Sequence, residues 1–462
     1  MNKVLIRAGI SPFDSFSPEK MIARNSIGNN VGNLIYQYGV FRTLTSENLE
    51  VIPDYYGVEN GKIKLNDAEK INDNYIAYVC PFADAFRPNF IKNLKLYTKL
   101  IEKLEIPFIV AGIGVKTSIK KLDNKNFSFD NEVCDFINAV NGTGTIVGVR
   151  GEITADYLTN LGFEENTDFM ITGCPSMFTF GKHMKINTKG ITYKSTVSIN
   201  SSLKSSRSII KFISKSSEEF YKYYFLPQWL SEFHLSYLGS PELKKKNKFY
   251  PTSLKSRMYK NNNVYFPINA KGWINFLKKV DFSFGTRLHG NIAATLAGTP
   301  SITIVKDGRM KEVADYHNLA RINSKEIKKF DSILELINSV DFNSPEKEHE
   351  KRFKNYLKFW EKNGITTIYK NNFSLKNAPL DEKIRNTSKL EPIISISNLN
   401  KNQVNKRLKN YQHEYKKWNK ERKRVIYHEK LNYIKSQPTL YSKLNETYNI
   451  LKKYINKKYL KK

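Results

Sequence analysis

The chain has 462 residues, and 75 Lys or Arg against 44 Asp or Glu give it a formal net charge of +31. A hydrophobic content of 40% and an aromatic content of 13% exclude a wholly disordered or collagen-like chain. No apolar run approaches the ~20 residues that cross a bilayer, and residues 1–14 lack the apolar stretch of a signal peptide. We therefore expect an intracellular, soluble protein, at most peripheral to a membrane.

The positive charge comes mainly from lysine, with 60 Lys and 15 Arg. Proteins that read nucleic acids specifically favour Arg, whose planar fork binds two oxygens at once. A solvated basic surface is therefore the preferred interpretation, and no specific nucleic-acid partner is expected. Cys80, Cys134 and Cys174 include no C-x-x-C pair, so the sequence predicts neither a disulfide framework nor a zinc site.

Residues 1–185 alternate between short apolar runs and helical patterns. Strand-length apolar runs occur at 4–7, 75–80, 108–111 and 145–149, and helical spacing occurs at 90–104 and 152–161. Buried strands that alternate with helices indicate a parallel sheet covered by helices. We predict an N-terminal Rossmann-like domain over 1–185.

The pattern weakens over 186–262 and becomes clear again over 263–340. In the weak part we expect strands near 196–200 and 224–227. In the clear part, a helix at 273–280, a strand at 281–284, a helix at 291–297 and a strand at 301–305 form a βαβ pattern. We predict a second Rossmann-like domain over 186–340.

Residues 341–462 are expected to form a helical, strongly basic extension. From residue 400 onward the chain has 19 basic and 4 acidic residues. One apolar stripe at helical spacing consists of Val404, Leu408, Tyr411, Tyr415, Trp418 and Val425, and a second consists of Leu444, Tyr448, Leu451, Ile455 and Tyr459. The preferred interpretation is a helical appendage docked on the main body, and the alternative is peripheral contact with an anionic membrane or a partner.

The strongest chemical signal is the segment that follows the strand at 281–284. Arg287, Leu288 and His289 occupy the turn into a helix, and Gly290 would let a ligand approach the backbone. Ligands of open α/β sheets bind outside the carboxyl ends of the strands, and a helix N-terminus attracts anions. The turn therefore suits an anion site with a titratable imidazole, although Arg287 and His289 could equally be structural.

This segment resembles the polysaccharide pyruvyl transferase family, whose R-x-H-G signature corresponds to residues 287–290 and is followed by a small-residue helix that ends in G-x-P (298–300). Further resemblances occur in family order at 26–34 (SIGNNVGNL), 110–115 (VAGIGV), 148–152 (GVRGE) and 171–176 (ITGCPS). A family-like element with Asp307, Arg309 and Glu312 follows. The resemblance implies two Rossmann-like domains that face a cleft, the GT-B-like architecture.

The resemblance also implies an activity: transfer of a pyruvyl (1-carboxyethylidene) group from phosphoenolpyruvate to two sugar hydroxyls of a surface polysaccharide or its lipid-linked precursor, forming a ketal. On this expectation Arg150 and Arg287 grip the phosphate and carboxylate from the two domains. His289 is the general acid or a phosphate ligand. We expect no cofactor and no metal ion. We expect a cytoplasmic location, at most peripheral to the inner face of the membrane.

Several of the supporting residues can be interpreted in two ways. Asp307 and Glu312 are more easily explained as structural caps than as proton relays. Asn29 and Asn30 suit either a plain turn or contact with the acceptor.

Gly112 and Gly114 suit a tight strand-to-helix turn better than phosphate binding.

The competing function is a GT-B glycosyltransferase that uses a nucleotide sugar. The acceptor sugar and the oligomeric state are not specified by the sequence.

Overall fold

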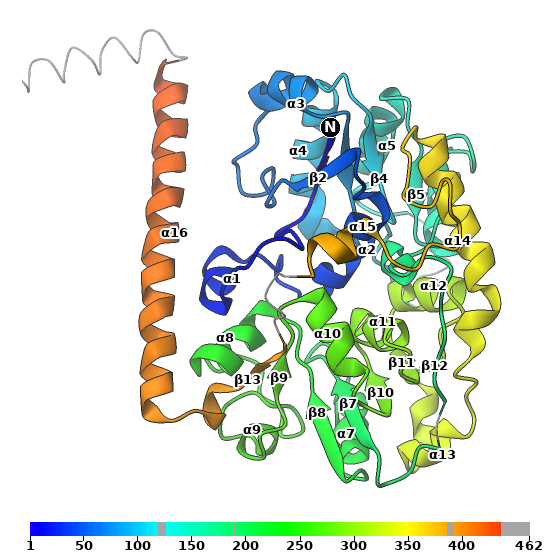
Figure 1. The fold of residues 1–462 in the computed structure, drawn as a ribbon, viewed down its shortest axis with the longest axis vertical. Coiled ribbons are helices and arrows are strands. Elements are labelled where there is room, and N and C mark those ends of the chain that lie inside the picture. The colour runs from blue at the N-terminus through cyan, green and yellow to red at the C-terminus, as the bar shows by residue number, and fades with distance from the viewer. Residues whose placement is uncertain (119–125, 189, 386–390, 436–462) are drawn as a thin grey trace, which may run out of the picture. The chain divides into compact units, whose positions relative to one another are not determined.

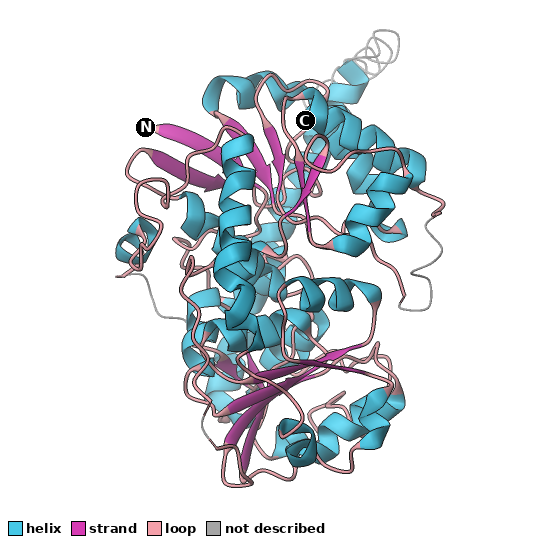
Figure 2. Ribbon diagram, turned by 90° about the vertical axis from the view of Figure 1, so that its right-hand side faces the viewer, coloured by secondary structure: helices cyan, strands magenta, loops and turns pink. Residues whose placement is uncertain are grey.

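The computed structural model describes residues 1–118, 126–188, 190–385 and 391–435 (Figure 1). Residues 1–407 form one compact unit, and a second unit begins at Leu408. The first unit contains two groups of parallel strands, which Figure 2 shows in magenta. We call the part built on the first sheet lobe 1 and the part built on the second sheet lobe 2.

Lobe 1 is built on parallel strands in the order β2-β1-β3-β4, next to the parallel pair β5-β6. A parallel bridge between Ile113 and Val149 joins the pair to the larger sheet. The strands are β1 (Asn2–Ile6), β2 (Leu49–Pro53), β3 (Ala77–Cys80), β4 (Phe108–Val110), β5 (Val147–Val149) and β6 (Phe169–Ile171). The helices are α1 (Pro18–Arg24), α2 (Gly32–Leu44), α3 (Ala68–Asn74), α4 (Ile91–Ile101), α5 (Asp130–Gly142) and α6 (Glu152–Asn160), with 3-10 turns η1 (Leu65–Asp67), η2 (Pro88–Phe90) and η4 (Pro175–Phe178).

Lobe 2 has a five-stranded parallel sheet in the order β12-β11-β10-β7-β8. Its strands are β7 (Thr196–Asn200), β8 (Lys222–Phe225), β10 (Phe282–Gly285), β11 (Ser301–Val305) and β12 (Arg321–Asn323), with the short β9 (Tyr265–Phe266) beyond β8. Its helices are α7 (Arg207–Ser217), α8 (Leu230–Leu238), α9 (Arg257–Lys260), α10 (Ala270–Leu277), α11 (Leu288–Leu296), α12 (Gly308–Tyr316) and α13 (Ile333–Ile337), with η5 (Glu326–Lys329). The chain runs outward in one direction from β7 to β8 and in the other from β10 to β12, so β7 and β10 flank a topological switch point.

Each lobe has its own apolar core. The larger cluster in lobe 1 includes Tyr78, Phe108 and Phe136, and the cluster in lobe 2 includes Ile199, Phe284 and Ile304. Continuous burial along β3 and β11 reflects sheets that are covered on both faces, as parallel sheets normally are. The fold class is therefore confirmed as two Rossmann-like α/β lobes in a GT-B-like arrangement.

Residues 344–399 lie within the same compact unit as the two sheets. On helix α14 (Ser344–Lys362), the ring of Tyr356 stacks on that of Phe178 of lobe 1, with the ring centroids 4.7 Å apart. The buried Arg42 donates to the carboxylate of Asp381 on α15 (Pro379–Lys383) at 2.7 Å. The short strand β13 (Ile393–Ile394) pairs antiparallel with β9 of lobe 2, and η6 (Ile396–Asn398) follows it.

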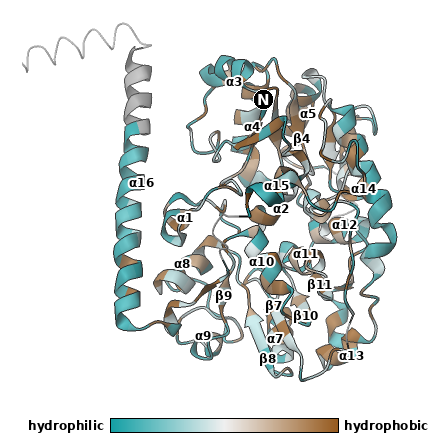
Figure 3. Ribbon diagram, in the orientation of Figure 1, coloured by the Kyte–Doolittle hydropathy of each residue, from teal (hydrophilic) through white to brown (hydrophobic). Residues whose placement is uncertain are grey.

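Helix α16 (Lys401–Lys435) carries the first apolar stripe predicted for the C-terminal extension; the second, at 444–459, lies outside the described residues. Figure 3 shows that most of the described part of α16 is hydrophilic. Among the described residues, no helix combines the length and the apolar character that crossing a bilayer requires.

Most predicted elements occur within a few residues of their expected bounds. The strands expected at 196–200 and 301–305 are β7 and β11. The helix predicted at 291–297 begins earlier, because Arg287 is the N-cap of α11. Leu288 and His289 therefore lie in the first helical turn rather than in the turn before it.

Candidate functional site

The site is built where β7 and β10 end, at the switch point of lobe 2. The side chain of Asn200 accepts a hydrogen bond from the backbone N–H of Arg287 at 2.7 Å and donates to Asn291 at 2.8 Å. Gly285 has a φ of 149°, and a Cβ there would lie 1.8 Å from the carbonyl oxygen of Asn200. Glycine is therefore required for the two strand ends to approach this closely.

Arg287 links the two lobes. Its Nη2 donates to Oδ1 of Asn30 in lobe 1 at 3.1 Å, and its Nε donates to Oε1 of Gln228 at 3.4 Å. Its guanidinium carbon lies 4.3 Å from the ring centroid of Trp229. Glu232 accepts the backbone N–H groups of Gln228 and Trp229, each at 2.7 Å, and so fixes the segment on which the guanidinium rests. The guanidinium plane is thereby held before any ligand arrives.

His289 points toward lobe 1 from the first turn of α11. Its Nε2 lies 3.8 Å from Sγ of Cys174, and its ring packs edge-on against Tyr36 with centroids 5.8 Å apart. A Cβ at Gly32 would lie 2.9 Å from Nδ1 of His289, so the glycine at the start of α2 makes room for the imidazole. Burial, followed by the positive charges of Arg150 and Arg309, lowers the pKa of His289 well below its ordinary value.

Arg150 approaches the same imidazole from lobe 1. It is 1% exposed, its Nε donates to the carbonyl of Gly112 at 2.9 Å, and its guanidinium carbon lies 4.9 Å from the centroid of Tyr36. The hydroxyl of Tyr36 donates in turn to the carbonyl of Ala111 at 2.8 Å. Within the described structure, Nη2 of Arg150 has no hydrogen-bond partner. A buried donor without a partner is costly, and an anionic ligand would satisfy it.

A third arginine joins this group through Asp84. Arg309, on α12, donates to Asp84 of lobe 1 at 2.9 Å, and Arg87 lies 2.7 Å from the other carboxylate oxygen. Burial alone would raise the pKa of Asp84, but the guanidinium groups of Arg309, Arg87 and Arg150 together lower it below its ordinary value. Asp84 therefore remains ionised and holds Arg309 in place.

Glu312 lies at the contact of α12 with α6. Its Oε1 accepts the backbone N–H of Thr154 at 2.7 Å, which caps the first turn of α6. Its Oε2 has no partner within the described structure and lies 3.4 Å from where a Cβ on Gly114 would stand. Burial is the largest influence on this carboxyl and raises its pKa to about 7, against the opposing effects of the Thr154 hydrogen bonds and of Arg150. The group is thus both a helix cap and a titratable acid.

The remaining predicted residues divide between support and packing. Asn30 accepts a hydrogen bond from Arg287. The backbone N–H of Asn29 donates to Oδ1 of Asn25 at 2.7 Å, and its carbonyl accepts from the N–H of Leu230 at 3.0 Å. Asp307 caps α12 by accepting from Met310 N–H at 3.0 Å.

The three glycines contribute room rather than donors. A Cβ on Gly112 would lie 2.5 Å from the Tyr36 hydroxyl, one on Gly114 would lie 3.0 Å from Cδ of Arg150, and one on Gly290 would lie 2.5 Å from Nε2 of Gln228. Leu288 is buried at 5% exposure.

Sequence reasoning missed several residues of this site. Six residues that were not predicted contact the predicted residues or influence them electrostatically: Asp84, Cys174, Lys204, Gln228, Trp229 and Lys306. Lys306 directly follows the strand predicted at 301–305, so the rule that ligands bind at carboxyl ends of strands could have identified it. Gln228 and Trp229 lie in the segment where the sequence pattern was weak.

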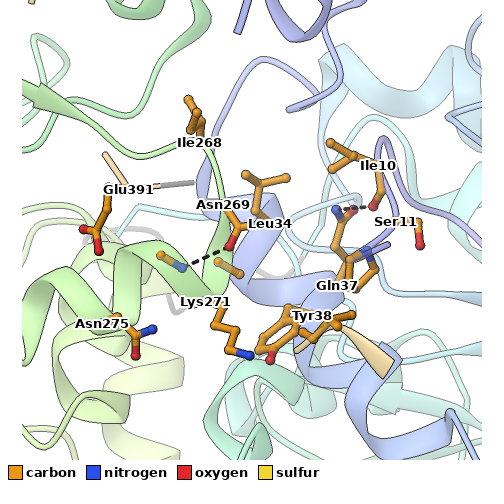
Figure 4. A pocket seen from close by; sticks show the side chains of 14 residues that line it. Ile10, Ser11, Leu34, Gln37, Tyr38, Ile268, Asn269, Lys271, Asn275 and Glu391 are labelled. Carbon is orange, nitrogen blue, oxygen red and sulfur yellow. Dashed lines mark hydrogen bonds between the residues drawn. The ribbon is translucent and has the colours of Figure 1, made fainter. Parts of the chain in front are cut away.

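A separate pocket lies between the lobes beside the first half of α2. It is lined by Gln37 and Tyr38 from lobe 1 and by Asn269 and Lys271 from lobe 2, among others (Figure 4). Dashed lines in Figure 4 show that Gln37 and Asn269 are already bonded, to the carbonyl of Ile10 and to the N–H of Gly272. None of the predicted site residues lines this pocket.

Within the described residues there is no cluster of three or more His, Cys, Asp or Glu side chains placed to hold a metal ion.

Comparison with solved structures finds UDP-GlcNAc 2-epimerases among the similar folds. The enzyme of Methanocaldococcus jannaschii, solved with UDP-GlcNAc and UDP, is 12% identical, with 77% of this chain and 98% of that chain covered at a TM-score of 0.44. The enzyme of Neisseria meningitidis bound to UDP-GlcNAc is 11% identical, with 78% and 100% covered at a TM-score of 0.40. MnaA of S. aureus with UDP is 12% identical, with 78% and 94% covered at 0.41.

A search of curated proteins found no match. The family model for polysaccharide pyruvyl transferase matches residues 30–307, which is more than half of the chain and includes Asn30, Arg150, Arg287 and His289. The chain belongs to the polysaccharide pyruvyl transferase family.

Proposed function

We propose that this protein transfers the pyruvyl group of phosphoenolpyruvate to two hydroxyls of a sugar in a polysaccharide or its lipid-linked precursor, forming a ketal. The observation that carries the proposal is the grouping of arginines from both lobes around His289. Arg287, two residues before His289, donates across the lobes to Asn30, and the ring of Tyr36 contacts both Arg150 and His289. Arg309 of lobe 2 is held against Asp84 of lobe 1. Phosphoenolpyruvate carries a phosphate and a carboxylate on one small molecule. A site with three guanidinium groups from two lobes suits such a ligand.

The reaction requires a proton at the methylene carbon of the enol. Protonation turns this carbon into a methyl group and leaves the neighbouring carbon with oxocarbenium character. One sugar hydroxyl attacks that carbon, the C–O bond to phosphate breaks, and the second hydroxyl closes the ketal. Of the two hydroxyl protons, one restores the acid and the other leaves with inorganic phosphate.

His289 is the proposed general acid. In the free protein its lowered pKa keeps the imidazole neutral near pH 7. A bound dianion beside it would offset the positive charges of the three arginines and raise that pKa, so the proton would be taken up when the donor binds. Glu312, with a pKa of about 7, is the alternative acid and lies on the Arg150 side.

The assay is release of inorganic phosphate from phosphoenolpyruvate in the presence of a lipid-linked oligosaccharide. Acceptor-dependent phosphate release supports the proposal. Release of a nucleoside diphosphate from a nucleotide sugar, with no phosphate from phosphoenolpyruvate, would instead support the competing glycosyltransferase function. Lys211→Gln, at an exposed position on α7 away from the site, is the control for a change of one charge.

The proposal extends to partners and location. Phosphoenolpyruvate acts as donor substrate with no further cofactor, and the reaction takes place in the cytoplasm. The basic segment from residue 400, with 19 basic and 4 acidic residues, is proposed to contact the anionic inner face of the membrane. This contact would bring the site to a lipid-linked acceptor.

A further inference from the structure

Two lysines lie beside Arg287 and are not used by the chemistry described above. Nζ of Lys306 donates to Oγ of Ser205 at 3.1 Å, and Ser205 donates in turn to Oγ1 of Thr286 at 3.2 Å. Nζ of Lys204 lies 4.6 Å from the ring centroid of Trp229, the same ring that holds Arg287. Three cations and two hydroxyls are therefore grouped on one side of the site.

These groups come from the loops after three neighbouring strands. Lys204 and Ser205 follow β7, Thr286 follows β10, and Lys306 is the first residue after β11. Because β7, β10 and β11 are adjacent and parallel, their carboxyl ends meet at one edge of the sheet. This edge contains the switch point, where open α/β sheets bind phosphate-bearing ligands.

The two lysines lie near other cations, and the carboxylates that act on them do so without a direct ion pair. Within the described residues, neither Lys204 nor Lys306 forms an ion pair with an acidic side chain within 4.0 Å. Burial, followed by the charge of Arg287, lowers the pKa of Lys306 to about 7; Asp307 opposes this, and Arg309 and Lys204 reinforce it. Burial, followed by Lys116, Arg287 and Arg309, also lowers the pKa of Lys204, although Asp84 opposes it. Cations arranged in this way gain most from an anion that lies between them.

We propose that Lys204, Lys306 and Arg287, with the hydroxyls of Ser205 and Thr286, form a subsite for the phosphate monoester of the donor. This assignment rests on the proposed function and specifies how the donor is oriented. The unpartnered Nη2 of Arg150 then receives the carboxylate at the opposite end. His289, which feels the charges of both Arg150 and Arg287, lies beside the enol that joins the two anionic groups.

The first experiment measures binding of inorganic phosphate to the full-length protein by titration calorimetry. Removing one charged hydrogen-bond donor is expected to weaken binding by about tenfold or more in Lys306→Met and in Lys204→Gln. Lys211→Gln removes the same charge from the exposed face of α7 and is expected to bind phosphate as the wild type does. Equal phosphate affinity in the wild type and in both site variants would overturn the proposal.

A second readout is proton uptake, obtained by repeating the titration in buffers of different ionisation enthalpy. Phosphate binding near pH 7.5 should add a proton to Lys306, and Lys306→Met should lose that uptake while remaining folded by circular dichroism. Uptake that is unchanged in Lys306→Met would show that the ammonium does not meet the anion.

Kinetics separate the two sources of phosphate, the donor and the pyrophosphate of a lipid-linked acceptor. A raised KM for phosphoenolpyruvate in Lys306→Met supports the donor assignment. A raised KM for the lipid-linked acceptor alone would overturn it. Phosphate binding that depends on both lysines, in a protein that never releases phosphate from phosphoenolpyruvate, would support the subsite and refute the proposed function.

Discussion

Replacing Glu312 with glutamine tests whether ionisation of this buried carboxyl destabilises the folded protein as the pH rises. The pKa of this carboxyl is raised from 4.5 to about 7, chiefly by burial, so the folded protein binds its proton more tightly than the unfolded chain does. The stabilising effect of that proton is complete below the unfolded value of 4.5 and is lost as the pH rises through about 7. A shift of this size corresponds to about 3 kcal/mol of unfolding free energy.

Glu312→Gln removes this dependence because the amide does not ionise and its oxygen can still accept from Thr154. The free energy of unfolding of both proteins is measured in urea near pH 5 and near pH 8.5. Between these two conditions, it should fall by about 2–3 kcal/mol more in the wild type than in the variant. Glu47→Gln, at an exposed carboxyl, controls for the loss of a negative charge. A difference between wild type and Glu312→Gln that is the same at both pH values would refute the reasoning.

Three further predictions concern catalysis, packing and the basic segment. His289→Gln should lower the rate of phosphate release about 100-fold or more with little change in unfolding free energy; full activity would remove His289 from the proposed mechanism. Arg42→Ala should destabilise the protein by about 3 kcal/mol in urea, because it leaves the carboxylate of Asp381 and the carbonyl of Thr179 without their charged donor; an unchanged midpoint would contradict this. A chain ending at residue 407 should remain folded and bind anionic vesicles more weakly in a sedimentation assay, and loss of folded protein would contradict the independence of the two units.

The sequence was most informative where the chain is buried on both faces. Continuous apolar runs such as β11 admit few interpretations, and the βαβ pattern around residues 281–305 predicted the lobe that contains the switch point. It was least informative over 186–262. There, the helix α8 (Leu230–Leu238) follows Trp229, whose role depends on a cation from 58 positions further along the chain.

The site itself was only partly predictable. Arg287, His289 and Arg150 were predicted from motifs, which mark residues whose chemistry is local to one turn. Asp84 and Lys306 were not predicted. The position of Lys306 directly after a predicted strand could have marked it as a candidate, but its partners become known only once the neighbouring strands are placed. Lys306 shares an edge with Ser205, a hundred residues away, through the pairing of β11 with β10 and of β10 with β7. No periodicity in the sequence encodes that proximity.

The same crowding of charge has a cost for the folded protein, and this cost gives a last prediction. The ammonium of Lys306 is half-buried near Arg287, Arg309 and Lys204, and its pKa falls from 10.5 to about 7. A lysine whose pKa is lowered by folding destabilises the folded state at every pH below its unfolded value, so Lys306→Met should unfold at a higher urea concentration than the wild type near pH 7. Saturating phosphate should narrow or reverse this difference, because a ligand that binds only the folded wild type adds to its stability. If Lys306→Met were less stable than the wild type without phosphate, Lys306 would stabilise the fold by packing. The destabilisation expected of an anion site would then have to come from other residues.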